Sequence, residues 1–236
     1  MSAAQPIEPD MVVVSAATVT IGAPEYLPQL ELGHPWPGPM EEEITTFSIG
    51  KYAVTREEYG RFVDDGGAVP LAWERPNLQD PRFPALGLSW ENARDYAAWL
   101  SDRTGRAYRL PFAAEWEAAA RGGLDGKAFP WGDDAPGDQC CWGREEADPP
   151  DPLDAHPPNG YGLYNMVGNA WAWCQDLWAD IADDAPVNTP TGLEARVDRV
   201  LRGGSYMSGE SMPYCAYRHE DPPDLQHVCL GMRLAL

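Results

Sequence analysis

Short apolar stretches predict the first strands of the chain. Met11–Val14 and residues 18–21 are rich in valine, threonine and isoleucine, which favours two short β-strands. Residues 22–43 are rich in proline, glycine and acidic side chains, and we expect a loop there. Apolar and polar residues then alternate roughly over 44–54, which predicts a further strand.

Three stretches with helical spacing follow. Thr55 and Glu58 form a capping-box pattern that predicts a helix ending at the glycine pair 66–67. Ser89 is an N-cap candidate for a second helix that extends to about residue 104 and ends before Gly105. A third, shorter helix is expected to begin at Pro111. Residues 68–88 are predicted as loop, and no long helix is expected after residue 124.

Composition and charge exclude several classes of protein. The formal net charge of −20 repels phosphate backbones, so we do not expect nucleic-acid binding. The acidic surface serves solubility or attracts a partner with basic residues. No apolar stretch is long enough for a membrane helix, and the first residues lack a signal-peptide pattern. Five cysteines cannot all pair within one chain. We therefore expect a cytoplasmic protein with reduced thiols.

Five blocks of sequence are more specific. They read RLPFAAEWEAAARGG at residues 109–123, FPWG at 129–132, NGYGLYNMVGNAWAW at 159–173, VLRGGSY at 200–206 and LGMRL at 230–234. In this order and spacing they resemble the formylglycine-generating-enzyme family. The resemblance implies an α+β domain with a C-type lectin-like fold, loop-rich, with few short helices and an irregular β-sheet. We expect a flexible tail over 1–10 and one domain over 11–236.

The resemblance also implies a chemistry that this sequence only partly supports. The family's oxidase converts a cysteine of a sulfatase peptide to formylglycine, using O₂ and copper(I) held by two cysteines after the RGGS block. Here Ser208 holds the first of these positions and Pro213 the second, and Cys215 follows two residues later. A hydroxyl does not replace a thiolate on copper(I). Copper is thus disfavoured with one cysteine, unless Met207 or Met212 adds a thioether.

A calcium site is implied in a weakened form. By the resemblance, Asn165, Gly168 and Ala170 match residues that bind a structural calcium ion, but Ala172 stands where the family has a glutamate. Because calcium needs six to eight oxygen ligands with carboxylates among them, we expect the site to be weakened or empty. The acidic loop over 145–154 is an alternative calcium site or a solvated run of charge.

The histidines suggest two further possibilities. His219 and His227, with Asp221 or Glu220, would supply the residue types of a two-histidine, one-carboxylate iron site. Residues 202–233 also resemble the sulfoxide synthases of ergothioneine biosynthesis, and that resemblance places Asp221 near the substrate. Those enzymes carry their iron on a separate helical domain that this sequence does not contain, so we do not expect their activity from this chain alone.

Two hypotheses of function remain open, and the sequence does not decide whether the protein is an enzyme. The first is an O₂-dependent oxidoreductase acting on a peptide or small metabolite, with Cys215, Asp221 and Ser208 as catalytic residues and Cys215 as thiol or metal ligand. The second is a non-catalytic module, similar to the variable proteins of diversity-generating retroelements, that binds a peptide, protein or small-molecule ligand on the face formed by 207–229. The residues expected on that face are Met207, Glu210, Tyr214, Tyr217, Arg218, His219, Glu220, Leu225 and His227.

Overall fold

The computed structural model describes residues 5–23, 38–178, 197–209 and 214–236. Two two-stranded ribbons and one four-stranded sheet are formed by strands β1 (Met11–Val14), β2 (Ala17–Ile21), β3 (Met40–Ile44), β4 (Phe47–Gly50), β5 (Trp171–Leu177), β6 (Arg199–Arg202), β7 (Arg218–Asp221) and β8 (Leu230–Gly231). The helices are α1 (Arg56–Asp64), α2 (Trp90–Thr104), α3 (Ala113–Arg121) and a single 3₁₀ turn, Pro76–Leu78.

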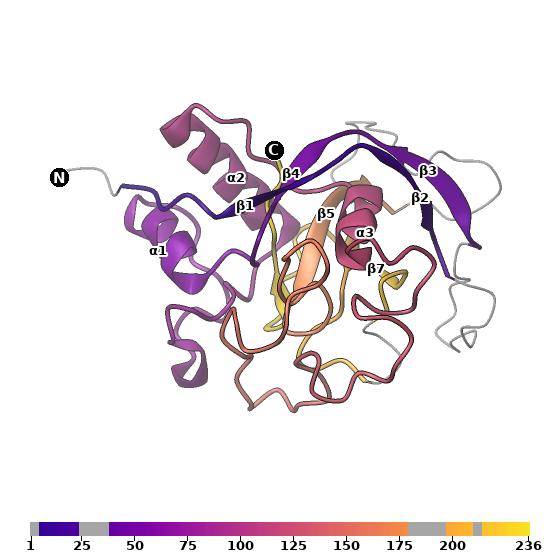
Figure 1. Cartoon of the computed structure of the whole chain (residues 1–236). Coiled ribbons are helices and arrows are strands. Elements are labelled where there is room, and N and C mark those ends of the chain that lie inside the picture. The colour runs from indigo at the N-terminus through magenta and orange to yellow at the C-terminus, as the bar shows by residue number, and fades with distance from the viewer. Residues whose placement is uncertain (1–4, 24–37, 179–196, 210–213) are drawn as a thin grey trace.

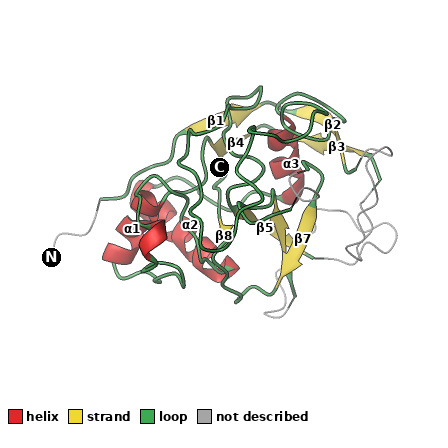
Figure 2. Ribbon diagram, turned by 90° about the horizontal axis from the view of Figure 1, so that it is seen from below, coloured by secondary structure: helices red, strands yellow, loops and turns green. Residues whose placement is uncertain are grey.

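The ribbons and the sheet lie on opposite sides of α3. Strand β1 pairs with β4 and β2 with β3, both antiparallel, and the two ribbons arch past α3 (Figure 1). The sheet has the order β7-β6-β5-β8, in which only β5 and β8 are parallel. Helices α1 and α2 lie together at the other end of the molecule (Figure 2). No described helix is long and apolar enough to cross a membrane.

The predicted caps of the first two helices are confirmed. Thr55 Oγ1 accepts a hydrogen bond from the Glu58 backbone N–H at 3.1 Å, and Glu58 Oε2 accepts one from the Thr55 N–H at 2.7 Å. Ser89 caps α2 in the same manner, and Gly105 ends it in the left-handed conformation at φ 72°. These helices were predictable because their caps are local in sequence.

Two predicted boundaries are wrong. Helix α3 begins at Ala113 rather than Pro111, because Phe112 is extended and its N–H is bonded by the Glu115 carboxylate at 2.8 Å. The single strand expected over 44–54 is two strands, since the β3–β4 connection breaks at Thr46, whose hydroxyl bonds the Ala16 N–H.

The expected loop over 22–43 also departs from prediction, because its last residues, from Met40, belong to β3. Its acidic side chains are tolerated there since β3 pairs only with β2 and leaves them half-buried or exposed. Within the expected tail, Glu8 accepts hydrogen bonds from Tyr108 and Arg106.

The core is divided into two apolar clusters. One surrounds α1 and α2 and includes Trp171 and Trp173, and the other surrounds α3 and includes Cys174. Tryptophan N–H groups join the start of α2 and the loop before it to the sheet: Trp173 donates to Leu88 O at 2.9 Å, and Trp90 donates to Cys174 O at 2.8 Å. Large aromatic side chains therefore supply packing that the short helices do not.

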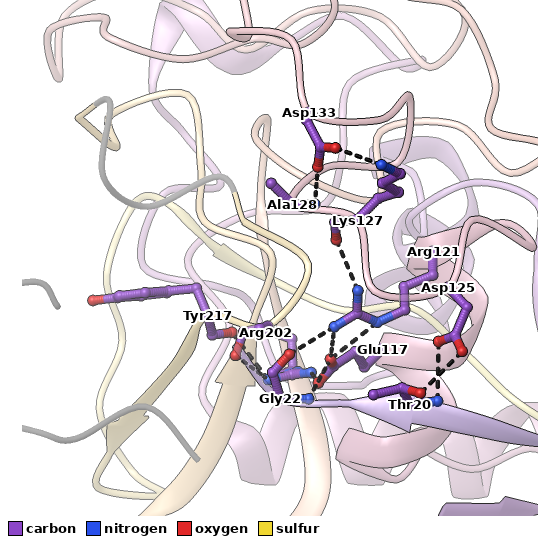
Figure 3. A network of polar contacts seen from close by, with 11 residues as sticks. Thr20, Gly22, Glu117, Arg121, Asp125, Lys127, Ala128, Asp133, Arg202 and Tyr217 are labelled. Carbon is purple, nitrogen blue, oxygen red and sulfur yellow. Dashed lines mark hydrogen bonds and ion pairs between the residues drawn. The ribbon is translucent and has the colours of Figure 1, made fainter. Parts of the chain in front are cut away.

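A buried charged network fixes α3 between the sheet and the β2 end (Figure 3). Glu117 lies between two guanidinium groups, those of Arg121 and Arg202. Its Oε1 also accepts the Gly22 N–H at 2.8 Å, and Arg202 donates to the Tyr217 carbonyl at 3.1 Å. One carboxylate thus holds together the ends of β2, α3 and β6.

Candidate functional site

Strand β7 divides the predicted ligand-binding face between two sides of the four-stranded sheet, because successive side chains of a strand point to opposite faces. His219 lies 5.5 Å from Trp171 between ring centroids, and its Nε2 is 3.8 Å from Asp221 Oδ2. The Arg218 guanidinium lies instead over Trp178, 5.0 Å from the ring centre. We name these surfaces the Trp171 side and the α3 side. The sequence pattern did not separate them.

A thiol and an imidazole meet on the Trp171 side. Cys229 Sγ is 3.0 Å from His227 Nδ1, and the Ser205 hydroxyl is a further hydrogen-bond partner of the thiol. Burial raises the pKa of Cys229 to about 11, so the thiol is protonated at neutral pH. The Tyr206 hydroxyl is buried within electrostatic range of Cys229, and it has no hydrogen-bond partner in the described ranges.

Sequence reasoning missed Cys229 as a site residue. It assigned the remaining thiol chemistry to Cys215, the cysteine nearest the RGGS block. The signal that could have found the pair is the His-x-Cys spacing of His227 and Cys229, directly before the LGMRL block.

Ser208 and Cys215 do not form a metal site together. Ser208 is buried, and its Oγ accepts the Ser205 N–H at 2.8 Å. Cys215 is fully buried in the cluster around α3, and its N–H donates to Ala128 O at 2.9 Å. Burial raises the pKa of the Cys215 thiol to about 12. Pro213 lies outside the described residues. These residues do not fit a two-thiolate copper site.

Aromatic members of the predicted face are engaged in packing. Tyr214 stacks on Phe129 with ring centroids 4.9 Å apart, and Tyr217 is buried 5.6 Å from Trp171. Met207 is half-buried against the core cluster around α1 and α2. These side chains therefore pack against the protein, and little of their surface is left to contact a ligand.

Asp221 lies on the Trp171 side with His219, whereas Glu220, by the alternation of β7, points with Arg218 to the α3 side. Burial raises the pKa of the Asp221 carboxyl, the charges of Asp198 and Glu220 add to this, and the two nearby histidines oppose it. Leu225 is exposed. Glu210 lies outside the described residues. Among the described residues, no three His, Cys, Asp or Glu side chains are arranged to hold a metal ion, which includes the predicted iron set.

The residues matched to calcium ligands form a tight turn. Asn165 adopts φ 48° and Gly168 φ 73°, and the Ala170 N–H bonds the Gly168 carbonyl at 2.8 Å. Asn165 Nδ2 donates to Leu153 O at 3.0 Å, while its Oδ1 is buried with no hydrogen-bond partner in the described part of the chain. Ala172 contributes only a buried methyl group. One free amide oxygen without a carboxylate does not fit the oxygen shell that calcium requires.

An ion-pair cluster stabilises the acidic loop beside this turn. Asp151 Oδ2 bonds Arg144 at 2.8 Å and His156 Nε2 at 2.9 Å. The Asn169 side chain bonds both the N–H and the carbonyl of Asp151. The carboxylate of Asp151, one of the candidate calcium ligands, is therefore already paired with the Arg144 guanidinium and bonded to His156.

Known proteins resemble this chain over its whole length. A family model described as "Sulfatase-modifying factor enzyme 1-like domain" matches residues 1–236. The formylglycine-generating enzyme of Bos taurus is 38% identical over 185 residues, covering 69% of this chain and 48% of that protein. The enzyme of Thermomonospora curvata is 39% identical over 197 residues, covering 71% and 62%. The chain thus spans about half to three fifths of these relatives.

A relative from Bos taurus described as inactive C-alpha-formylglycine-generating enzyme 2 is 35% identical over 169 residues, covering 65% of this chain and 50% of that protein. Among solved structures, PvdO from Pseudomonas aeruginosa superposes with a TM-score of 0.80 at 26% identity, covering 96% of this chain and 94% of PvdO. Treponema denticola variable protein 1 has a TM-score of 0.77 at 22% identity, with coverages of 95% and 94%, which shows a shared fold alone.

Proposed function

The chain belongs to the sulfatase-modifying factor enzyme 1-like family, and from this premise we propose that it binds a cationic peptide or small molecule on the Trp171 side. The observation that carries the proposal concerns the residues that stand for the two cysteines of the family's oxidase: Ser208 at the first position, and Cys215, two residues beyond the second. Ser208 has its hydroxyl engaged by Ser205, and Cys215 is enclosed in the other core cluster. The scaffold is retained while the two-thiolate chemistry is not supported.

The charge of the rim supports a cationic ligand. Asp221 lies close enough to Asp198 and Glu220 for their charges to raise its pKa further. A positive group beside Asp221 would relieve this repulsion. His219, with its side chain 43% exposed, stands over Trp171 and would contact the rest of the ligand. The net charge of −20 would also speed the approach of a basic ligand.

Fluorescence anisotropy with a fluorescein-labelled, lysine-rich peptide tests the proposal. We expect the peptide to bind, and its acetyl-lysine counterpart to bind at least about tenfold more weakly, since acetylation removes the charge. Asp221→Asn should weaken binding by a similar factor. Asp102→Asn, on the exposed face of α2, is the matched control and should leave binding unchanged. Equal binding by both variants would refute a site at Asp221.

A second candidate function, an oxidoreductase acting on a peptide or small metabolite with O₂, is favoured by the Cys229–His227 contact. Thiolate and imidazole are both ligands of copper(I), and copper binding would displace the proton that burial leaves on the Cys229 thiol. Copper(I) titration against a chromophoric chelator under argon, on wild type, Cys229→Ser and Cys215→Ser, distinguishes the candidates. Tight binding lost only in Cys229→Ser supports the oxidoreductase. Absent binding, or equal binding by all three, contradicts it.

A further inference from the structure

A cleft lies between the outward face of α1 and the segment 73–81, at the end of the molecule away from α3 (Figure 1). Its volume is about 240 Å³. Sites for drug-sized ligands begin at about 300 Å³, so this cleft suits a smaller molecule. Its lining residues come from α1 and from this segment, and not from the four-stranded sheet, so the cleft is separate from the Trp171 side.

Arg56 is held rigidly on one wall of the cleft. Its guanidinium stacks over the Trp73 ring, 3.8 Å from the ring centre, and its Nη2 donates to Gln79 Oε1 at 2.8 Å. Gln79 is fixed in turn, because its Nε2 donates to the carbonyls of Trp73 at 2.9 Å and Arg75 at 2.7 Å. A guanidinium that is already oriented loses less freedom when it bonds a ligand.

This guanidinium has no ion-pair partner within the described residues. Arg56 is half-buried, and burial lowers its pKa, while the charge of Glu74 opposes this shift from a longer range. The neighbouring carboxylate of Glu57 lies 3.7 Å from Arg61 instead. The N–H groups of Arg56 that Gln79 does not use are therefore available to an anion that enters the cleft.

Gly60 keeps the middle of the cleft open. It lies in the interior of α1, where glycine is unfavourable. Packing does not require a glycine at this position, because an added Cβ would lie 3.7 Å from the Trp73 ring, which is an ordinary contact distance. The missing side chain therefore leaves room beside Trp73 that any larger residue would fill.

A negative charge stands at the other end of the cleft. Asp64 is exposed and forms no ion pair with the residues that the structure describes. Residues four apart on a helix share a face, so Arg56, Gly60 and Asp64 follow one another along α1. The rise of a helix separates Arg56 from Asp64 by about 12 Å. The cleft thus has a cation at one end, a gap in the middle and an anion at the other end.

We propose that this cleft binds a short free peptide as a zwitterion, with its carboxylate on Arg56 and its ammonium group at Asp64. A guanidinium bonds a planar carboxylate through two parallel N–H groups. An extended chain spans about 3.3–3.6 Å per residue, so a tripeptide of about 10 Å matches the separation of the two charges. A simple anion would gain the contact with Arg56 alone and would be repelled by Asp64.

Isothermal titration calorimetry with triglycine on the full chain tests the proposal. We expect binding at a single site. Triglycine amide lacks the carboxylate and N-acetyl-triglycine lacks the ammonium group, and each should bind at least about tenfold more weakly. Arg56→Gln should weaken triglycine binding by a similar factor. Arg94→Gln is the matched control, because it removes an exposed guanidinium on α2 that also lies over a tryptophan, and it should leave binding unchanged.

A second variant covers a loss of folding in Arg56→Gln. Gly60→Leu fills the middle of the cleft and replaces glycine with a better helix former, so its midpoint in urea should be no lower than that of wild type. Its affinity for triglycine should nevertheless fall by about tenfold or more. The proposal is overturned if wild type does not bind triglycine, if either blocked peptide binds as tightly as triglycine, or if Arg56→Gln or Gly60→Leu binds it as wild type does.

Discussion

Replacing Glu117 by glutamine should destabilise the protein far more than any surface change of the same chemistry. Glu117 Oε1 accepts bonds from Arg121 at 2.5 Å and from the Gly22 N–H at 2.8 Å, while Oε2 bonds Arg202. The side chain is 4% exposed. The amide keeps the shape but removes the charge that two buried guanidinium groups share. They would then remain buried without a counter-ion, which is the costly outcome for a charged group.

The magnitude follows from that burial. Breaking a buried ion pair by removing one partner costs about 3–5 kcal/mol. Domains have about 5–15 kcal/mol of stability in total, so this is a large fraction. For a domain of this size each kcal/mol lowers Tm by about 2–4 °C, so we expect a decrease of about 6–20 °C.

Urea denaturation followed by tryptophan fluorescence measures the free energy of unfolding of this variant. The matched control is Glu57→Gln, which removes one partner of the exposed pair with Arg61, 3.7 Å apart. That change should cost at most about 0.5 kcal/mol. If Glu117→Gln lies within about 1 kcal/mol of this control, the network is not the buried counter-ion system inferred from its geometry.

Three further changes test separate parts of the structure. Cys215→Ser should lower the free energy of unfolding by about 1–3 kcal/mol in urea denaturation, because the serine hydroxyl would be buried, and should leave peptide binding on the Trp171 side unchanged. Loss of peptide binding would show that Cys215 contributes to that site. Burial raises the pKa of Asp176 from 3.8 to about 6. The folded state therefore holds this proton more tightly than the unfolded state does. The contribution of Asp176 to the free energy of unfolding is fully present below about pH 4 and is lost as pH rises through about 6. At 1.36 kcal/mol per pKa unit, the loss is about 3 kcal/mol. Asp176→Asn should flatten that stretch of the stability-pH curve, and an unchanged slope would contradict the assignment. Gly203→Ala should lower Tm, because φ is 90° and the new Cβ would lie 2.7 Å from Met166 O; an unchanged Tm would show that the backbone can relax there.

Much of the fold could be predicted because its signals are local. The Thr55 and Ser89 caps lie within three residues of the groups they bond, and the family blocks fix the fold class. Strand β3 could not be predicted, since its acidic residues resemble a loop and only its pairing with β2 makes it a strand.

The candidate site was harder, because it depends on contacts between distant segments. The expected face over 207–229 appears continuous in sequence. Its division into two sides follows from the alternation of β7, which cannot be known before that strand is placed in the sheet. Spacing from the RGGS block pointed to Cys215, but burial in the other core cluster is a tertiary property. Cys229 instead reaches the Trp171 side because β8 pairs with β5.

The shortness of β7 has a thermodynamic consequence. Arg218 and His219 are adjacent residues, so the two surfaces share one backbone segment of four residues. A ligand that displaced this segment from one side would also move the side chains on the other. Linkage requires the effect to be equal in both directions, so the factor by which a ligand on one side changes an affinity on the other must equal the factor for the reverse effect. Affinities measured on either side would then describe the pair of surfaces jointly.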